Sequence, residues 1–152
     1  MVYHRQIISR DAEETREVGR ELAKDLLKQG KHDLPKIVLL YGELGSGKTT
    51  LVQGFANGIG IFSRLLSPTF IIVRRYSLSH SLYYFYHIDL YKVQSEKAII
   101  NLGLTEILTE PGSIICIEWA EKLGRIKPDR RVDIFFTLRR DNQHEIDINY
   151  QS

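Results

Sequence analysis

A glycine-rich stretch that ends in lysine and threonine offers the clearest chemistry in this chain of 152 residues. Residues 42–49 read Gly-Glu-Leu-Gly-Ser-Gly-Lys-Thr and match the pattern G-x-x-x-x-G-K-[ST] in full. Glycines let the backbone curl so that successive N–H groups point at a phosphate chain. In such a loop Lys48 reaches the β- and γ-phosphate oxygens, and the Thr49 hydroxyl ligates Mg²⁺. The stretch therefore predicts a nucleotide-phosphate site.

Two acidic residues could complete such a site. It needs a carboxylate that holds Mg²⁺, directly or through water, and a group that orients the attacking water. Glu118 ends an apolar run over 114–117, where a sheet delivers a carboxylate beside a phosphate loop. Asp89 ends another β-prone run, 83–88. From the residues alone, either acid qualifies for either role.

Three further residues have two interpretations each. Thr69, in Ser67-Pro68-Thr69, belongs either to a proline-rigidified turn or to a mobile loop whose hydroxyl senses the γ-phosphate or Mg²⁺. Trp119 follows Glu118 and either contacts a nucleotide or partner or packs in the core. His87 has no second ligand at metal spacing, which favours a structural or surface histidine.

The hydrophobic pattern predicts strands and helices that alternate along the chain. Apolar runs at 37–41 and 114–117 are typical of strands buried on both faces. Asp11 and Glu14 stand at capping-box spacing before a helix over 11–29. The other predicted elements are a strand over 2–8, a helix from 48 to the glycines at 58 and 60, a hairpin of 70–76 and 82–87, a helix over 96–108 interrupted at Gly103, and closing strands at 132–138 and 144–150.

This order of elements indicates an α/β fold in one domain, residues 1–152. We expect a three-layer fold of the P-loop NTPase type. Its mixed, mostly parallel sheet would carry an antiparallel hairpin, and helices would cover both faces.

The composition excludes several classes of protein. With 43% hydrophobic and 26% charged residues, the chain is neither disordered nor fibrous. A net charge of +2 is too small a bias to indicate DNA or other dedicated nucleic-acid binding. The single cysteine, Cys116, allows no internal disulfide or cysteine metal cage. No stretch approaches the length of about 18 apolar residues that a membrane helix needs, so we expect a cytoplasmic protein without membrane contact.

The class of phosphate-loop protein can be narrowed by absent motifs. The chain lacks an N-K-x-D tetrapeptide and a D-x-x-G after the second strand, which argues against a Ras-like GTPase. A compact ATPase or a small-molecule kinase remains, and residues 125–131 would be the only plausible kinase lid. A module that binds nucleotide without needing its hydrolysis is a third possibility.

Several blocks together resemble the bacterial TsaE (YjeE) family, and their order and spacing match over almost the whole chain. They are the phosphate loop at 42–50, Ser-Pro-Thr-Phe at 67–70, Tyr-His-Ile-Asp-Leu-Tyr-Lys at 86–92, Leu-Gly-Leu at 102–104 and Ile-Glu-Trp-Ala-Glu-Lys at 117–122. The family's proteins are small P-loop ATPases needed to make threonylcarbamoyladenosine, the modified adenosine beside the tRNA anticodon. They do not transfer the carbamoyl group; they act on a complex of TsaD, the transferase, and TsaB, which raises their weak ATP hydrolysis.

The resemblance implies roles for individual residues. ATP and Mg²⁺ would be the cofactors, tRNA would be reached only through the TsaD–TsaB complex, and Thr49 and Glu118 would ligate the metal. Lys48, Asp89 and Glu118 would be catalytic, with Asp89 needed for hydrolysis. The residues expected to contact the nucleotide are Glu43, Leu44, Gly45, Ser46, Gly47, Lys48, Thr49, Thr50, Thr69 and Trp119.

Overall fold

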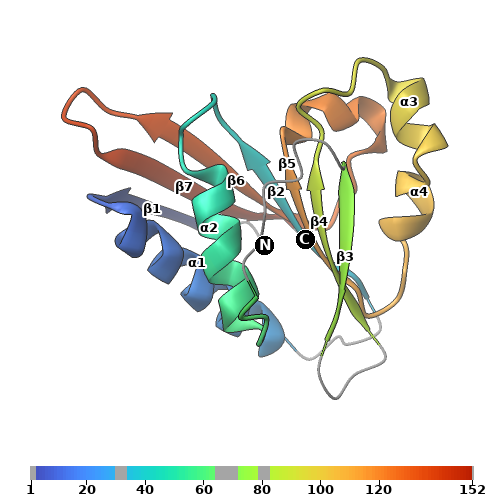
Figure 1. The fold of residues 1–152 in the computed structure, drawn as a ribbon, viewed down its shortest axis with the longest axis horizontal. Helices are drawn as coiled ribbons and strands as arrows, with labels where there is room; N and C mark the ends of the chain where they lie inside the picture. The colour runs from blue at the N-terminus through green and yellow to red at the C-terminus, as the bar shows by residue number, and fades with distance from the viewer. Residues whose placement is uncertain (1–2, 30–33, 64–71, 79–82, 152) are drawn as a thin grey trace.

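The computed structural model describes residues 3–29, 34–63, 72–78 and 83–151 (Figure 1). The elements in chain order are β1 (Tyr3–Ser9), α1 (Ala12–Leu27), β2 (Lys36–Tyr41), α2 (Lys48–Gly58), β3 (Val73–Ser77), β4 (Tyr84–Asp89), α3 (Glu96–Asn101), α4 (Leu104–Ile107), β5 (Ile114–Glu118), the 3₁₀ helix η1 (Ala120–Ile126), β6 (Arg131–Leu138) and β7 (His144–Gln151). This order confirms the predicted alternation of strands and helices, and η1 is an addition to it.

The strands form one seven-stranded mixed sheet in the order β1-β7-β6-β2-β5-β4-β3. The central strands β6, β2, β5 and β4 run parallel. Antiparallel strands close both sides, with β3 beside β4 and with β7 and β1 beyond β6. The carboxyl ends of the four parallel strands therefore meet at one edge of the sheet, as the predicted α/β fold requires.

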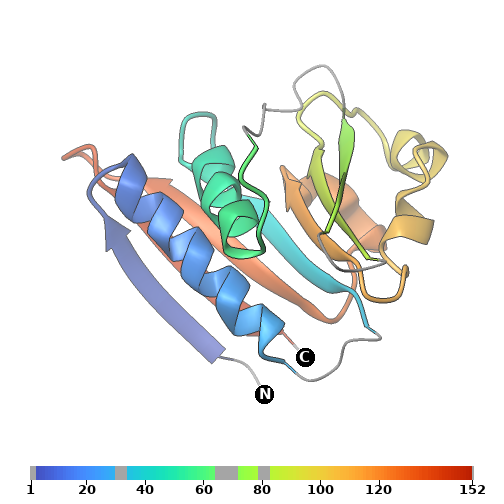
Figure 2. The same ribbon diagram turned by 60° about the horizontal axis from the view of Figure 1, so that its bottom comes forward.

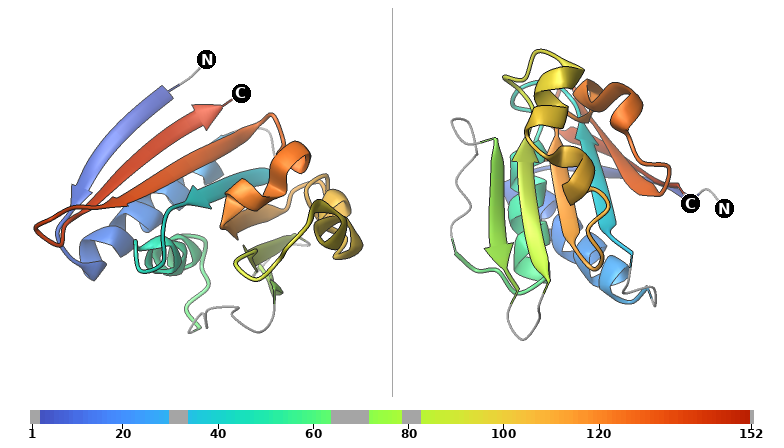
Figure 3. Two further views of the ribbon diagram at one scale, coloured as in Figure 1. Left: turned by 90° about the horizontal axis from the view of Figure 1, so that it is seen from above. Right: turned by 90° about the vertical axis from the view of Figure 1, so that its right-hand side faces the viewer.

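Helices cover both faces of the sheet because its central strands alternate between two apolar cores. In β2, Val38 and Leu40 pack under α1 and α2, whereas Ile37 and Leu39 face α3, α4 and η1. Figure 2 shows α1 and α2 side by side across the first face, and Figure 3 shows the second group of helices on the opposite side. This confirms the predicted three layers.

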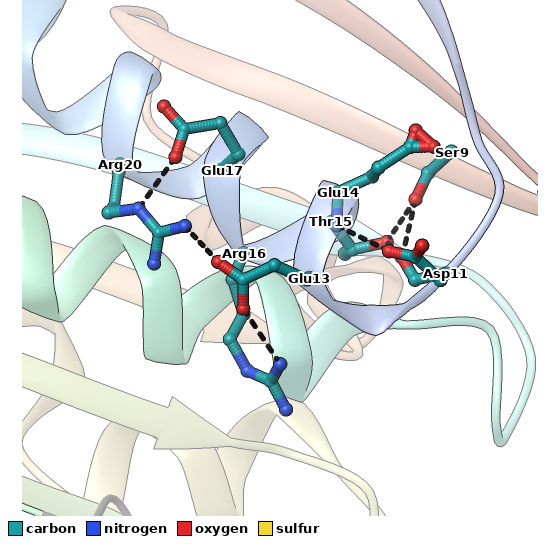
Figure 4. A network of polar contacts seen from close by, with 8 residues as sticks. All are labelled: Ser9, Asp11, Glu13, Glu14, Thr15, Arg16, Glu17 and Arg20. Carbon is teal, nitrogen blue, oxygen red and sulfur yellow. Dashed lines mark hydrogen bonds and ion pairs between the residues drawn. The ribbon is translucent and has the colours of Figure 1, made fainter.

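Helix α1 starts where its sequence signals predict. Asp11 has an extended backbone, and its side chain accepts a hydrogen bond from the Glu14 N–H at 2.8 Å (Figure 4). The hydroxyls of Ser9 and Thr15 lie 2.6 Å apart in a buried contact that ties the helix to the end of β1. The helix ends at Leu27, two residues before the predicted end at 29. Ion pairs on its exposed face join Glu13, Arg16, Glu17 and Arg20.

Helices α1 and α2 touch backbone to backbone through glycines. A Cβ atom on Gly19 would lie 2.2 Å from the carbonyl oxygen of Leu51, and one on Gly54 would lie 1.9 Å from the carbonyl oxygen of Arg16. No side chain fits at either position, so the close approach of the two helices depends on glycine at both. This contact fixes α2, the helix that follows the glycine-rich loop.

The segment between β4 and β5 also follows its prediction. Gly103, with a φ of 78°, separates α3 from α4, which confirms the interruption of the predicted helix over 96–108. None of the helices in the described ranges is long and apolar enough to cross a membrane.

We predict that Gly54→Ala destabilises the protein because its methyl group would overlap the α1 backbone. Overpacking of this kind costs about 1–3 kcal/mol. Urea denaturation should therefore give a lower free energy of unfolding for Gly54→Ala, with an unchanged m-value. Gln53→Ala, at the partly exposed neighbouring position of α2, is the matched control and should unfold like the wild type. Equal stability of both variants would contradict the backbone contact.

Candidate nucleotide-phosphate site

The glycine-rich loop leaves the carboxyl end of β2 and leads into α2. Gly42, Gly45 and Gly47 have φ angles of 147°, 77° and 108°, a region that favours glycine. A Cβ on Gly42 would lie 2.7 Å from the Ser46 hydroxyl oxygen, so the loop folds tightly over this glycine. Around Gly45 a Cβ would meet nothing within 4 Å. The loop is therefore closely packed at its base and open at its tip.

The amino end of α2 faces the same space as the loop. No side chain caps this helix, since its cap residue is Gly47. The first N–H groups of a helix lack partners within it and carry a partial positive charge. A phosphate is the ligand that such an arrangement of backbone N–H groups binds.

Lys48, the first residue of α2, is directed back toward the loop. Its ammonium group donates to the carbonyl oxygens of Gly42 and of Glu43, the latter at 2.8 Å, and to the Ser46 hydroxyl at 3.3 Å. Only 5% of Lys48 is exposed. Burial lowers its pKa from the ordinary value, and the surrounding carboxylates, Glu118 foremost, oppose that shift.

A hydrogen bond joins α2 to β5. The Thr49 hydroxyl donates to Glu118 Oε1 at 2.7 Å, and Glu118 is 2% exposed. Hydroxyl and carboxylate oxygens are the ligands that Mg²⁺ prefers, and this ion is commonly held by one or two protein groups together with phosphate oxygens and water. In the described residues no group of three or more His, Cys, Asp or Glu side chains could hold a metal by itself. The donor pair Thr49 and Glu118 thus fits Mg²⁺ bound with a phosphate ligand.

Asp89 ends β4 directly beside Glu118. The two residues are paired in the register of the parallel strands. Asp89 Oδ1 accepts a hydrogen bond from the Tyr91 N–H at 2.9 Å, which holds the carboxylate in place. Burial raises the pKa of Asp89; the hydrogen bond from Tyr91 opposes this shift, and the charge of Glu118 adds to it.

The indole ring of Trp119 contacts the ammonium group of Lys48. The Trp119 backbone is left-handed, with φ 59° and ψ 44°, a conformation that costs a non-glycine residue about 1–3 kcal/mol. Lys48 Nζ lies 4.5 Å from the centre of the indole ring, and the centres of the Tyr91 and Trp119 rings are 5.0 Å apart. Lys122 in turn donates to the Tyr91 carbonyl oxygen. The turn after Glu118 therefore aims an aromatic ring at the phosphate loop.

These groups line one cavity of about 540 Å³. Among the residues singled out in the sequence, it is lined by 44–50, Asp89, Glu118 and Trp119. Glu43 does not line it, although its carbonyl oxygen accepts from Lys48. Thr69 lies outside the described residues. The structure thus brings most of the predicted site together, from three different parts of the chain.

Two histidines contact this site, and neither contact was predicted from the sequence. His87 is fully buried, with Nε2 2.6 Å from Glu118 Oε2, so of its two interpretations the structural one is confirmed and the surface one is wrong. His144, the first residue of β7, donates from Nδ1 to the Ser46 carbonyl oxygen at 2.6 Å and also lines the cavity. His87 belongs to the block at 86–92, but neither contact could be predicted, because each joins residues that are far apart in the sequence.

Residues 125–131, the lid predicted for a kinase, run from the end of η1 into β6. None of them is among the residues that line the cavity. Arg131 starts β6, whose next residue, Val132, pairs with Val38 near the start of β2. This is the edge of the sheet opposite the glycine-rich loop. The arginine side chain is instead bound to Asp133 at 2.9 Å. In this structure the lid predicted for a kinase therefore does not line the cavity.

The fold and the site together define a P-loop protein. The glycine-rich loop lies between a central parallel strand and a helix, and an acidic residue ends the neighbouring strand β5. Comparison with known proteins then identifies the family. A family profile described as "Threonylcarbamoyl adenosine biosynthesis protein TsaE" matches residues 9–146. The chain belongs to the TsaE family.

Individual relatives agree with this assignment. The tRNA threonylcarbamoyladenosine biosynthesis protein TsaE of Treponema pallidum is 32% identical over 141 residues, which cover 93% of this chain and 97% of that protein. The protein of the same name from Borreliella burgdorferi is 41% identical over 104 residues, 68% of this chain and 74% of its own. The crystal structure of Bacillus subtilis YdiB superposes with a TM-score of 0.78 at 26% identity and covers 100% of this chain and 88% of that one.

Trp119 should report ligand binding at the loop. It is the only tryptophan in the chain, and its ring contacts Lys48. A phosphate ligand that draws Lys48 away would remove a cation–π contact of about 0.5–2 kcal/mol and change the surroundings of the indole. Titration with pyrophosphate should therefore change the tryptophan fluorescence in a saturable way. Lys48→Met should abolish this response, while Lys24→Met, at an exposed position of α1, should keep it. An unchanged emission in the wild type would contradict a ligand contact at Lys48.

Proposed function

We propose that this chain is a Mg²⁺-dependent ATPase that acts in the threonylcarbamoylation of tRNA adenosine in the cytoplasm, together with TsaD and TsaB. One observation carries the proposal: Lys48, Thr49 and Glu118 converge at the carboxyl edge of the parallel strands, with the Thr49 hydroxyl bonded to Glu118 at 2.7 Å. Membership of the TsaE family supports the link to threonylcarbamoyladenosine. tRNA would be reached only through the partner complex, since the chain's net charge is only +2.

The loop and Lys48 bind the phosphates of ATP in this proposal. The loop's backbone N–H groups and the amino end of α2 hold the phosphate oxygens, and the Lys48 ammonium exchanges its bonds to loop carbonyls for bonds to the β- and γ-phosphates. The low exposure of Lys48 strengthens this interaction, because charges attract more strongly where water is excluded.

Thr49 and Glu118 hold the metal, and Asp89 orients the water. Bound Mg²⁺ supplies neutralisation of the charge that develops on the phosphate oxygens. The Thr49 hydroxyl and one Glu118 oxygen are placed to hold it. Asp89 is fixed by the Tyr91 N–H and lines the same cavity, where its carboxylate accepts a hydrogen bond from the attacking water. Burial raises the pKa of Asp89 above that of an exposed aspartate.

The composition of the cavity supports dependence on partners. Apart from Lys48, none of its described lining residues is a lysine or arginine. In related phosphoryl-transfer sites, an arginine supplied by a second protein raises the rate by about 10³–10⁵-fold. We infer that the chain alone hydrolyses ATP slowly, and that contact with TsaD and TsaB supplies or orders the missing groups.

Removal of the Lys48 ammonium should abolish most of the ATPase activity. Loss of one group that stabilises charge in the transition state costs about 10²–10³-fold in kcat. We expect Lys48→Ala to reduce steady-state phosphate release by this factor, both alone and with TsaD and TsaB present. Lys24→Ala, an exposed lysine on α1, is the control. A Lys48→Ala protein that kept its partner-stimulated rate would disprove the assigned site.

Substitution of Asp89 should impair ATP hydrolysis without impairing ATP binding. Asp89→Ala should still bind ATP, because the phosphate contacts of the loop remain, while its hydrolysis falls by about 10²–10⁴-fold. The measurement is the formation of threonylcarbamoyladenosine over several catalytic cycles in a reconstituted reaction with tRNA, TsaD and TsaB. We expect formation by Asp89→Ala to stop after the first cycle. Normal turnover with this variant would indicate a nucleotide-dependent binding module in which hydrolysis is incidental.

ADP formation that required an added metabolite in place of the partner proteins would indicate a kinase.

A further inference from the structure

His87 lies directly under the carboxylate that the proposed function assigns to the metal. It is the fourth residue of β4, is fully buried, and pairs with Cys116 of β5. Side chains alternate along a strand, so His87, Asp89, Cys116 and Glu118 all point to the sheet face that α2 covers. The His87 ring thereby reaches two residues further along β5 than its own pairing partner and contacts the Glu118 carboxylate.

The contact assigns the protons on the ring. Glu118 Oε2 lies 2.6 Å from His87 Nε2, and a carboxylate oxygen accepts, so Nε2 carries the hydrogen. The other ring nitrogen, Nδ1, is buried and has no hydrogen-bond partner among the described residues. The tautomer with its hydrogen on Nε2 avoids a buried, unpaired N–H at Nδ1, which would be destabilising.

The two oxygens of Glu118 therefore have separate partners. Oε2 is held from below by His87, and Oε1 accepts from Thr49 at the floor of the cavity. A carboxylate bound at one oxygen cannot rotate freely about its terminal bond. The imidazole thus fixes the orientation in which the other oxygen faces Thr49.

We propose that His87 is a positioning residue for metal binding: its Nε2–H anchors Glu118 Oε2 and so presents Oε1, together with the Thr49 hydroxyl, to the Mg²⁺ of the bound nucleotide. This inference rests on the proposed function for its ligand. Groups that orient a metal ligand typically contribute about 10–100-fold to metal affinity. His87 itself touches neither nucleotide nor metal.

A role in core packing alone predicts a different outcome. The ring fills space beneath the sheet face, so its loss would lower stability whatever its contact with Glu118. His87→Phe keeps a ring of similar size and removes the donor, while His87→Gln places an amide N–H near the position of Nε2. Phe85→Leu, two residues earlier on the same face of β4, alters the same core and is far from the carboxylate in the strand pairing.

The first measurement uses the wild-type chain without nucleotide or metal. Long-range ¹H–¹⁵N correlation spectra of the histidine rings distinguish the two tautomers, and His87→Phe identifies the signals of His87. A proton on Nε2 is expected. A ring protonated only at Nδ1 would overturn the proposal, because Nε2 could then not donate to Glu118.

The second measurement is the Mg²⁺ dependence of ADP binding, followed by titration calorimetry at a series of Mg²⁺ concentrations and in EDTA. His87→Phe should weaken the apparent Mg²⁺ affinity by about 10–100-fold and leave binding in EDTA nearly unchanged. His87→Gln should restore most of that affinity, and Phe85→Leu should lower the melting temperature without altering the Mg²⁺ dependence. His87→Leu replaces the Phe variant if that variant does not fold.

Wild-type Mg²⁺ affinity in a folded His87→Phe or His87→Leu protein would overturn the positioning role. So would loss of Mg²⁺ affinity in Phe85→Leu equal to that in His87→Phe, since it would indicate a general core effect. If the wild-type chain bound ADP with no Mg²⁺ dependence, the proposed function would fail instead. The tautomer and a crystal structure of nucleotide-free His87→Phe would then decide the proposal, with an unmoved Glu118 side chain overturning it.

Discussion

The parallel register of β2, β5 and β4 is the constraint from which the site follows. Glu118 pairs with Leu40 on one side and with Asp89 on the other. These pairings bring a carboxylate from each of two strands to the point where the loop leaves β2. A shift of one residue in either pairing would turn every side chain of a strand to the opposite face and separate the acids from α2. The two apolar cores prevent such a shift, so the packing of the sheet and the chemistry of its edge are specified together.

Burial of charged and polar side chains at this edge is tolerated because each of them is hydrogen-bonded, either to the backbone or to another side chain. Lys48, His87, Asp89 and Glu118 are each at most 9% exposed. An isolated charge at such depth would be costly, but each of these side chains has a hydrogen-bond partner. Lys48 donates to the loop, Asp89 accepts from the Tyr91 N–H, and Glu118 contacts both His87 and Thr49. The loss of a single partner therefore disturbs the others, which is why changes at His87 and at Lys48 are expected to affect ligand binding more than folding.

Much of the fold, and the location of the site, could be predicted from the sequence. Apolar runs, the Asp11 cap and the break at Gly103 act through neighbours in the chain, and local patterns record them. The contact of His87 with Glu118 spans 31 positions and depends on which residues the strands pair, so a single sequence holds no sign of it. The left-handed turn at Trp119 and the short helix after it also escaped prediction, because a 3₁₀ segment is too short for a hydrophobic period to reveal.

The hydrogen bonds of Lys48 have a consequence for affinity. The three acceptors of its ammonium group are supplied by the loop itself, so an arriving phosphate must compete with them. Binding is then an exchange of one set of contacts for another, and its free energy is the small difference between the two. Such an exchange would limit how tightly the site of the proposed ATPase holds any phosphate ligand, its ADP product included.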